Sequence, residues 1–314
     1  MRPFIFALSL LLLSGALVAG CRPVVAEPTL PHAQIDLTPI AAIHQEILPE
    51  VAAPSLAAPT EQVVTLESEG QIVVGTLALP AMGEAPYPAV LLLHGFTNTR
   101  DELPVAGTNE KMYTRLARVL GEHGIASLRI DFRGSGESDG EWADTTFTGQ
   151  ISDTLKAIDY LASRPEIAAD RMGVLGFSQG GLVAAEAAAI DDRLQTVLLW
   201  SPVANPPDTY KWILSPESVA AGLQSGGKAI AVKTNWGAPL ELKTGFFTDL
   251  FRFDPTAAIA EVKDPLMVIV GTRDATVTPQ PYYGELFLTY HDGPEQLVTV
   301  DSDHVFNVVT DPWP

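Results

Sequence analysis

One serine stands in a setting that could make it a nucleophile. Gly176, Ser178 and Gly180 form a Gly-x-Ser-x-Gly pattern that follows the apolar run 172–175 and precedes a helix pattern of small residues. A strand, one sharp turn and a helix expose a serine hydroxyl at the strand tip, and the glycines let neighbouring backbone pass closely. The opening helix also directs N–H groups toward negative charge on a substrate. The pattern predicts a nucleophile, although an ordinary turn with an exposed serine also fits it.

A serine hydroxyl needs a base to take its proton and an acid to hold that base. Two later strand patterns end beside such groups: Asp274 follows the run that ends at Val270, and His304 follows the run that ends at Val300. Carboxyl ends of parallel strands meet at one edge of a sheet, so both side chains are expected near Ser178. The order along the chain is serine, acid, histidine.

Other residues compete for the roles of base and acid. His94 also follows a strand pattern, but it precedes the serine and lies in a His-Gly turn. Asp301 and Asp303 would reach His304 only through a tight local loop, so Asp274 is preferred. Simpler interpretations apply to three further residues: His123 ends a helix, His291 lies in a turn, and Asp131 orders the loop at Arg133 and Gly134.

Acyl transfer also requires N–H donors aimed at the oxyanion of the tetrahedral intermediate. Gln179, the residue after the serine, can supply one backbone N–H. Phe96 can supply the other from the loop after the apolar run 89–93, because Gly95 before it permits a close approach. Both donors are backbone groups, so neither side chain is expected to be essential.

Composition limits the class of protein. The 314 residues are 46% hydrophobic and 18% charged, enough for one large domain or two modest ones. The formal net charge of −19 argues against nucleic acid and against polybasic contact with anionic lipid. Metal-ligand spacings and phosphate-binding glycine loops are absent from the sequence, so we predict no metal and no cofactor. A small-molecule substrate is the expected partner, and the sequence does not indicate the oligomeric state.

The N-terminal region differs from the rest of the chain. A positive start at 1–3, an apolar run at 4–18 and small residues before Cys21, the single cysteine, resemble a bacterial lipoprotein signal peptide. We expect cleavage after residue 20, lipid modification of Cys21, and export to the extracytoplasmic side of a bacterial membrane. The proline- and alanine-rich residues 21–62 are interpreted as a linker. A plain signal peptide or an uncleaved anchor is the alternative.

Strand and helix patterns alternate from residue 63 onward, which predicts a mostly parallel sheet covered by helices on both faces. The alternation breaks between 203 and 254, a segment rich in aromatic and turn residues. The chain ends ten residues after His304, where such a fold usually adds one more helix, so either the sequence is truncated or the domain lacks that helix. Strands are predicted at 63–66, 71–79, 89–93, 125–130, 172–175, 194–200, 265–271 and 295–300, and helices at 110–122, 151–161, 182–185 and 282–288.

Several motifs together resemble the α/β-hydrolase superfamily. The likeness is greatest to its cinnamoyl/feruloyl esterase-like and serine-aminopeptidase-like branch, and it spans about residues 63–306. The motifs are His94-Gly95-Phe96-Thr97, Asp131-Phe132-Arg133-Gly134-Ser135-Gly136, Gly176-Phe177-Ser178-Gln179-Gly180-Gly181, Gly271-Thr272-Arg273-Asp274 and Asp303-His304.

The resemblance implies an α/β-hydrolase fold in residues 63–314, with residues 203–254 inserted as a lid over the active site. It implies Ser178 as nucleophile, Asp274 as acid, His304 as base, and Phe96 and Gln179 as oxyanion donors. The elbow residue Phe177 departs from the family, in which a histidine is common there. Its side chain is expected to point away from the substrate.

The sequence is compatible with three functions. The first is a serine hydrolase that cleaves carboxylic esters, and the aromatic residues of the lid suggest an apolar or aromatic acyl pocket, although they also suit a plain lid core. The second is a serine peptidase or aminopeptidase, with Glu217, Glu241 or Asp249 as candidates to hold a free amine. The third is an inactive, lipid-anchored binding protein. A dienelactone-type hydrolase is excluded, because Cys21 lies outside the domain.

Overall fold

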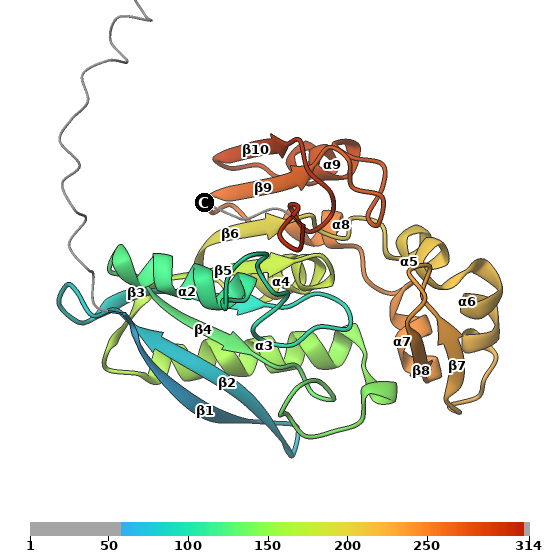
Figure 1. Ribbon diagram of the computed structural model, residues 1–314, viewed down its shortest axis with the longest axis horizontal. Helices are drawn as coiled ribbons and strands as arrows, with labels where there is room; N and C mark the ends of the chain where they lie inside the picture. The colour runs from blue at the N-terminus through green and yellow to red at the C-terminus, as the bar shows by residue number, and fades with distance from the viewer. Residues whose placement is uncertain (1–57, 311–314) are drawn as a thin grey trace, which may run out of the picture. The chain divides into compact units, whose positions relative to one another are not determined.

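A computed structural model describes residues 58–310 of the chain (Figure 1). Its centre is an eight-stranded sheet with the order β1-β2-β4-β3-β5-β6-β9-β10. β1 and β2 are antiparallel to their neighbours, whereas β4, β3, β5, β6, β9 and β10 run parallel to one another, so the predicted mostly parallel sheet is confirmed. The strands are β1 (Thr60–Ser68), β2 (Gln71–Leu79), β3 (Tyr87–Leu93), β4 (Ala126–Ile130), β5 (Ile167–Phe177), β6 (Leu194–Trp200), β9 (Leu266–Gly271) and β10 (Glu295–Val300).

The sequence pattern of each strand follows its place in the sheet. All five residues of β4 are buried, as expected for a strand covered on both faces, and its one charged residue, Arg129, forms ion pairs with Glu61 and Asp101. β1, at the edge, alternates between buried and exposed residues in its second half. β1 begins at Thr60, so residues 60–62, expected in the linker, pair with Leu77 to Leu79 of β2. Cys21, the predicted signal peptide and most of the predicted linker lie outside the described residues.

Helices cover both faces of the sheet, as predicted, but unevenly. α3, α4, α8 and α9 contribute to the larger core, which includes Ile158, Leu182, Ile259 and Phe287. Between residues 58 and 310, no helix is long and apolar enough to cross a bilayer. The helices of the sheet domain are α2 (Met112–Glu122), α3 (Phe147–Ser163), α4 (Gln179–Ile190), α8 (Pro255–Ile259) and α9 (Tyr282–Tyr290), with a short 3-10 helix, η2 (Trp142–Asp144).

The opposite face of the sheet has a smaller core around α2. Met112 and Tyr113 pack there with Phe306 and Val308 from the last described turn. The Ala106 N–H donates a hydrogen bond of 2.8 Å to the Val308 carbonyl, which holds that turn in place. Residues 301–310, the described part of the chain after β10, therefore cover part of this face without forming a helix.

The segment 203–254, which we call the insert, lies between β6 and α8. Its core is aromatic, and Tyr210, Phe246 and Phe247 are fully buried in it. Figure 1 shows the insert beside the carboxyl ends of the parallel strands. Trp212 Nε1 donates a hydrogen bond of 2.8 Å to the Ala275 carbonyl, which ties the insert to the loop after β9. The insert contains α5 (Pro206–Leu214), α6 (Pro216–Leu223), the hairpin β7 (Ile230–Lys233) and β8 (Pro239–Leu242), and α7 (Thr244–Asp249).

Candidate active site

Ser178 occupies a strained turn between β5 and α4. Its backbone angles are φ 54° and ψ −115°, a region that side-chain-bearing residues rarely adopt. The Ser178 N–H donates to the Trp200 carbonyl at 2.8 Å, which holds the turn against β6. A Cβ on Gly176 would overlap the Gly180 carbonyl, and a Cβ on Gly180 would overlap the Leu93 carbonyl. The glycines of the sequence motif are thus required by the close passage of backbone around the serine.

The structure brings Ser178, His304 and Asp274 together in one hydrogen-bonded line. His304 Nε2 lies 3.0 Å from Ser178 Oγ, and His304 Nδ1 lies 2.7 Å from Asp274 Oδ2. Asp274 is buried, and its Oδ1 accepts hydrogen bonds from the N–H groups of Thr276 (2.8 Å) and Val277 (2.9 Å). A carboxylate can only accept, so Nδ1 carries the proton and Nε2 is free to accept the serine proton.

The competing acids are engaged elsewhere. Asp301 is exposed and forms an ion pair with Arg273 at 2.8 Å. Asp303 Oδ1 accepts from the N–H groups of Val305 (3.0 Å) and Asn307 (2.7 Å), so it caps the turn that carries the histidine. Of the three acids weighed from the sequence, Asp274 alone is hydrogen-bonded to the imidazole of the histidine in the described part of the chain.

His94 is buried between two loops and does not line the pocket at the serine. Its Nδ1 lies 2.8 Å from the Gly95 carbonyl, and its Nε2 accepts the Phe132 N–H at 3.2 Å. Burial lowers the pKa of His94, so the ring is neutral. It joins the loops after β3 and β4. Among residues 58–310, the two remaining histidines bond elsewhere and do not line the pocket: His123 bonds the Val119 carbonyl at the end of α2, and His291 bonds the Asp264 carbonyl beyond α9.

Phe96 and Gln179 border the serine as the sequence predicts. Gln179 is the first residue of α4, so its N–H has no acceptor within the helix. The Phe96 N–H has no hydrogen-bond acceptor among residues 58–310. A Cβ built on Gly95 would lie 3.4 Å from Ser178 Cβ, so the loop after β3 passes close to the serine. Both amides are therefore available to a substrate oxygen.

One side-chain expectation at the elbow is wrong. Phe177 was expected to point away from the substrate, yet it lines the pocket and packs on the His304 ring with centroids 5.1 Å apart. The side chains of Phe96 and Gln179 are both buried against the insert, and the expectation that neither is essential stays a prediction.

The pocket at the serine is small and uncharged. Its volume is about 280 Å³, close to the lower end for small-molecule sites. Its described lining includes no carboxylate, ammonium or guanidinium group. Of the proposed amine ligands, Glu217 and Glu241 are exposed elsewhere on the insert, and Asp249 accepts the Thr148 N–H. The lining residues are Phe96, Thr97, Asn98, Leu103, Phe177, Ser178, Ile213, Trp236, Thr276, His304 and Val305.

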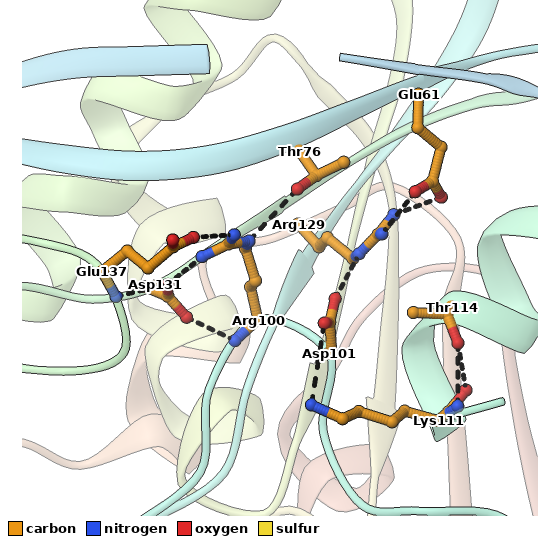
Figure 2. A network of polar contacts seen from close by, with 9 residues as sticks. All are labelled: Glu61, Thr76, Arg100, Asp101, Lys111, Thr114, Arg129, Asp131 and Glu137. Carbon is orange, nitrogen blue, oxygen red and sulfur yellow. Dashed lines mark hydrogen bonds and ion pairs between the residues drawn. The ribbon is translucent and has the colours of Figure 1, made fainter. Parts of the chain in front are cut away.

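A charged network supports the loop after β3 (Figure 2). Arg100 forms ion pairs with Asp131 and Glu137. Arg129 forms ion pairs with Asp101 at 2.8 Å and with Glu61 of β1 at 2.9 Å. These contacts join the loop to the ends of β4 and β1, so the expectation that Asp131 orders its own loop captures only part of its role.

Sequence reasoning missed Glu102, which lies beneath the same loop. Its carboxyl group accepts hydrogen bonds from the Gly95 N–H and from Asn98 Nδ2, the latter at 2.6 Å. Burial raises the pKa of Glu102 to about 8, against the opposing effect of these hydrogen bonds. The signal in the sequence that could have pointed to Glu102 was the charged run 100–102, shortly after the His94-Gly95-Phe96-Thr97 motif. Between residues 58 and 310, no three His, Cys, Asp or Glu side chains are grouped to hold a metal ion.

The chain is similar to several known hydrolases. It is 29% identical to the esterase EstD of Thermotoga maritima over 249 residues, which cover 74% of this chain and 57% of EstD. It is 33% identical to the putative hydrolase YtaP of Bacillus subtilis over 131 residues, 37% of this chain and 44% of that protein. The structure of Est1E from Butyrivibrio proteoclasticus with bound ferulic acid superposes with a TM-score of 0.64 at 23% identity, covering 78% of this chain and 92% of Est1E.

These likenesses agree with the fold and with the residues around Ser178. The sheet order, the flanking helices and the structural neighbours are those of the α/β-hydrolase fold, so the chain is a hydrolase of that fold. Residues 69–239, which include Ser178 and the first part of the insert, match the family model described as X-Pro dipeptidyl-peptidase (S15 family). This match spans more than half of the chain, so the chain belongs to the S15 family.

Proposed function

We propose that the chain cleaves carboxylic esters through an acyl-enzyme formed on Ser178. The observation that carries the proposal is the hydrogen-bonded line from Ser178 Oγ to His304 Nε2 (3.0 Å) and from His304 Nδ1 to Asp274 (2.7 Å). A serine with such a base, beside free backbone N–H groups, has the parts that acyl transfer requires.

In the acylation step, Ser178 Oγ attacks the ester carbonyl carbon while His304 Nε2 takes the hydroxyl proton. The carbonyl oxygen becomes an oxyanion and accepts hydrogen bonds from the N–H groups of Phe96 and Gln179. The imidazolium that forms is stabilised by the buried Asp274 carboxylate. When the intermediate collapses, the bond to the alkoxy oxygen breaks, and His304 returns the proton to the departing alcohol.

Water completes the cycle in the deacylation step. His304 takes a proton from a water molecule while the water oxygen attacks the acyl carbon. The same two N–H groups donate hydrogen bonds to the second oxyanion that forms. Collapse then breaks the bond to Ser178 Oγ, which regains its proton from His304. The products are a carboxylic acid and the free enzyme.

The character of the pocket favours esters with an uncharged, apolar or aromatic acyl group. Phe96, Phe177, Ile213 and Trp236 present apolar surface to the serine, and the described lining has no charged side chain. Apolar walls with a few polar groups are typical of small-molecule sites. A charged acyl group would lose its water there and gain no partner.

Removal of X-Pro dipeptides is the second candidate, and the family match of residues 69–239 favours it. A dipeptidyl-peptidase must hold the free ammonium group of its substrate, which ordinarily calls for a carboxylate near the serine. None lines the pocket in the described part of the chain. The ester proposal is therefore placed first.

One panel tests both candidates. We expect the purified protein to hydrolyse short p-nitrophenyl esters and to leave Ala-Pro-p-nitroanilide uncleaved, and Ser178→Ala to remove ester hydrolysis and labelling by a fluorophosphonate probe. Faster cleavage of the anilide than of any ester would favour the peptidase. Equal ester rates in Ser178→Ala and wild type would refute the nucleophile assignment. A wild type that is neither active nor labelled would favour the third hypothesis, an inactive binding protein.

We also propose that the protein is exported and carried on the extracytoplasmic side of a membrane by a lipid on Cys21. The support is the sequence pattern of residues 1–21. In a bacterial host, Cys21→Ala is expected to abolish incorporation of labelled palmitate and to move the protein out of the membrane fraction. Unchanged labelling in that variant would contradict the proposal.

A further inference from the structure

The two proposed oxyanion donors share one neighbour in the insert. Tyr210, on α5, is fully buried. Its ring packs edge-on against the Phe96 ring, with centroids 5.3 Å apart and planes at 84°. Its hydroxyl donates a hydrogen bond to Gln179 Oε1. A single side chain thus touches both residues whose N–H groups are proposed to bind the oxyanion, Phe96 after β3 and Gln179 after β5.

The Gln179 side chain is fixed at both of its polar ends. Its Nε2 donates to Gln150 Oε1 at 2.8 Å, and Gln150 Nε2 donates to Thr145 Oγ1 at 3.2 Å. Because Nε2 is occupied as a donor, Oε1 must accept from the Tyr210 hydroxyl. Burial raises the pKa of Tyr210 well above its ordinary value, so the hydroxyl stays protonated and remains a donor. All four side chains are buried, where hydrogen bonds hold geometry strongly.

The Phe96 side chain packs against three aromatic rings. It stacks on Phe246 of α7 (5.6 Å between centroids) and packs on Trp142 (5.5 Å), in addition to its contact with Tyr210. Tyr210 also packs edge-on against Phe246 at 5.0 Å. The position of the Phe96 backbone therefore depends on how the insert is seated.

We propose that Tyr210 is a positioning residue for the oxyanion hole and sets the spacing between the Phe96 and Gln179 N–H donors. The inference rests on the proposed function, since an oxyanion hole matters only if Ser178 forms a tetrahedral intermediate. Hydrogen bonds to an oxyanion act over about 2.7–3.1 Å, so a small displacement of either donor weakens them. The loss falls on the transition state and leaves substrate binding nearly unchanged, so it lowers kcat and leaves KM unchanged.

The test is Tyr210→Phe, which keeps the ring on Phe96 and removes the donor to Gln179. We expect kcat for a p-nitrophenyl ester to fall about tenfold to a hundredfold, somewhat less than for loss of a whole oxyanion donor, with KM within about twofold. The affinity for a trifluoromethyl ketone, which forms a tetrahedral adduct on the serine, should fall by the same factor. In the double variant with Gln179→Met, the second change should add little, because the bond is already lost.

Phe247→Leu is the matched control. Phe247 is fully buried in the same aromatic core and packs on Phe246 at 5.6 Å. It is expected to lower Tm while kcat and inhibitor affinity stay within about twofold of wild type. If Tyr210→Phe keeps wild-type kcat and inhibitor affinity, the inference is wrong. It is also wrong if Phe247→Leu lowers both as much as Tyr210→Phe does.

The failure of the inference and that of the proposed function give different results. A wild type that neither hydrolyses esters nor reacts with a fluorophosphonate probe overturns the proposed function, and the inference with it. A wild type that is active and labelled, beside a Tyr210→Phe variant with unchanged kinetics, overturns the inference alone.

Discussion

Two regions beside the pocket at Ser178 are held by different forces. The loops after β3 and β4 are fixed by charged hydrogen bonds, such as those that Asp131 accepts from the Arg100 N–H and the Arg100 guanidinium. The insert is fixed mainly by aromatic packing around Phe246. Charged hydrogen bonds are directional and fix atoms, whereas ring contacts accept small shifts.

This difference suggests a division of roles. The strand-end loops would hold the reacting groups in place, and the insert would shape the wall that meets the acyl group. Changes in the first region should then alter rate or stability, and changes in the second should alter selectivity. Tyr210 is the exception, since it carries a hydrogen bond from the insert to the elbow.

The largest effect is expected from Asp274→Asn. The change leaves the shape intact but removes the acceptor that keeps the proton on His304 Nδ1, so kcat for a p-nitrophenyl ester should fall about ten-thousand-fold. Asp301→Asn is the control, because Asp301 is exposed and paired with Arg273, and it should stay within about twofold of wild type. Equal losses of kcat in the two variants would mean that Asp274 is not the acid that holds His304.

A large loss of stability is expected from Asp131→Ala. The Asp131 side chain is buried and accepts the N–H groups of Arg100 (2.7 Å) and Glu137 (3.0 Å) as well as the Arg100 guanidinium. Its removal leaves these donors unsatisfied, so the free energy of unfolding should fall by about 3–5 kcal/mol in urea titrations. Glu137→Gln, at an exposed end of the network, should cost less than about 1 kcal/mol. Similar costs for the two variants would show that burial does not set the strength of this network.

A pH-dependent effect is expected from Glu102→Gln. Burial raises the pKa of Glu102 to about 8 in the folded protein from 4.5 otherwise, so the folded state holds a proton that the unfolded state loses between these values. Its contribution to stability is full below pH 4.5 and declines up to about pH 8, by at most about 1.4 kcal/mol per pH unit.

Urea unfolding from pH 4.5 to 9 measures this contribution as the difference between wild type and variant. The curve for Glu102→Gln should be flatter with pH, while that for Glu84→Gln, at an exposed site, should follow wild type. Parallel curves for wild type and Glu102→Gln would mean that Glu102 is ionised at neutral pH.

The smallest effect is expected from Trp236→Ala. Trp236 lies in the β7–β8 hairpin, lines the pocket, and is 50% exposed, so its loss should not unsettle the core. We expect kcat/KM to fall about tenfold for an aromatic ester and to change less than about twofold for an acetyl ester. Equal losses for both esters would mean that the hairpin affects the position of the reacting groups and not only the selectivity for the acyl group. The proposed division of roles between the two regions would then be wrong.

Most of the chemistry could be predicted because it follows from strand patterns. Ser178, Asp274 and His304 each come shortly after a strand pattern, and parallel strands deliver such positions to one edge of a sheet. The sheet itself was predictable for the same reason. Periodicity within a dozen residues carried this information, and no distant contact was needed.

The missed features depend on contacts between distant residues. Glu102 is buried because the loop after β3 folds back on itself, so that the Glu102 carboxyl group accepts the Gly95 N–H. Tyr210 lies on a separate helix, α5, and its hydroxyl donates to Gln179. Phe177 was placed wrongly because its contact is with the His304 ring, which comes from the turn after β10, far along the chain. The β7–β8 hairpin was also missed, since its four-residue strands are too short for a clear alternating pattern.

The uncharged lining of the pocket has a consequence for the end of the reaction. Hydrolysis of a neutral ester produces a carboxylic acid that ionises near neutral pH, and no ammonium or guanidinium group in the described lining can pair with it. The product anion would also face a protein of formal net charge −19. We therefore expect the acid to leave readily and to inhibit weakly, so that turnover continues as product accumulates around the enzyme.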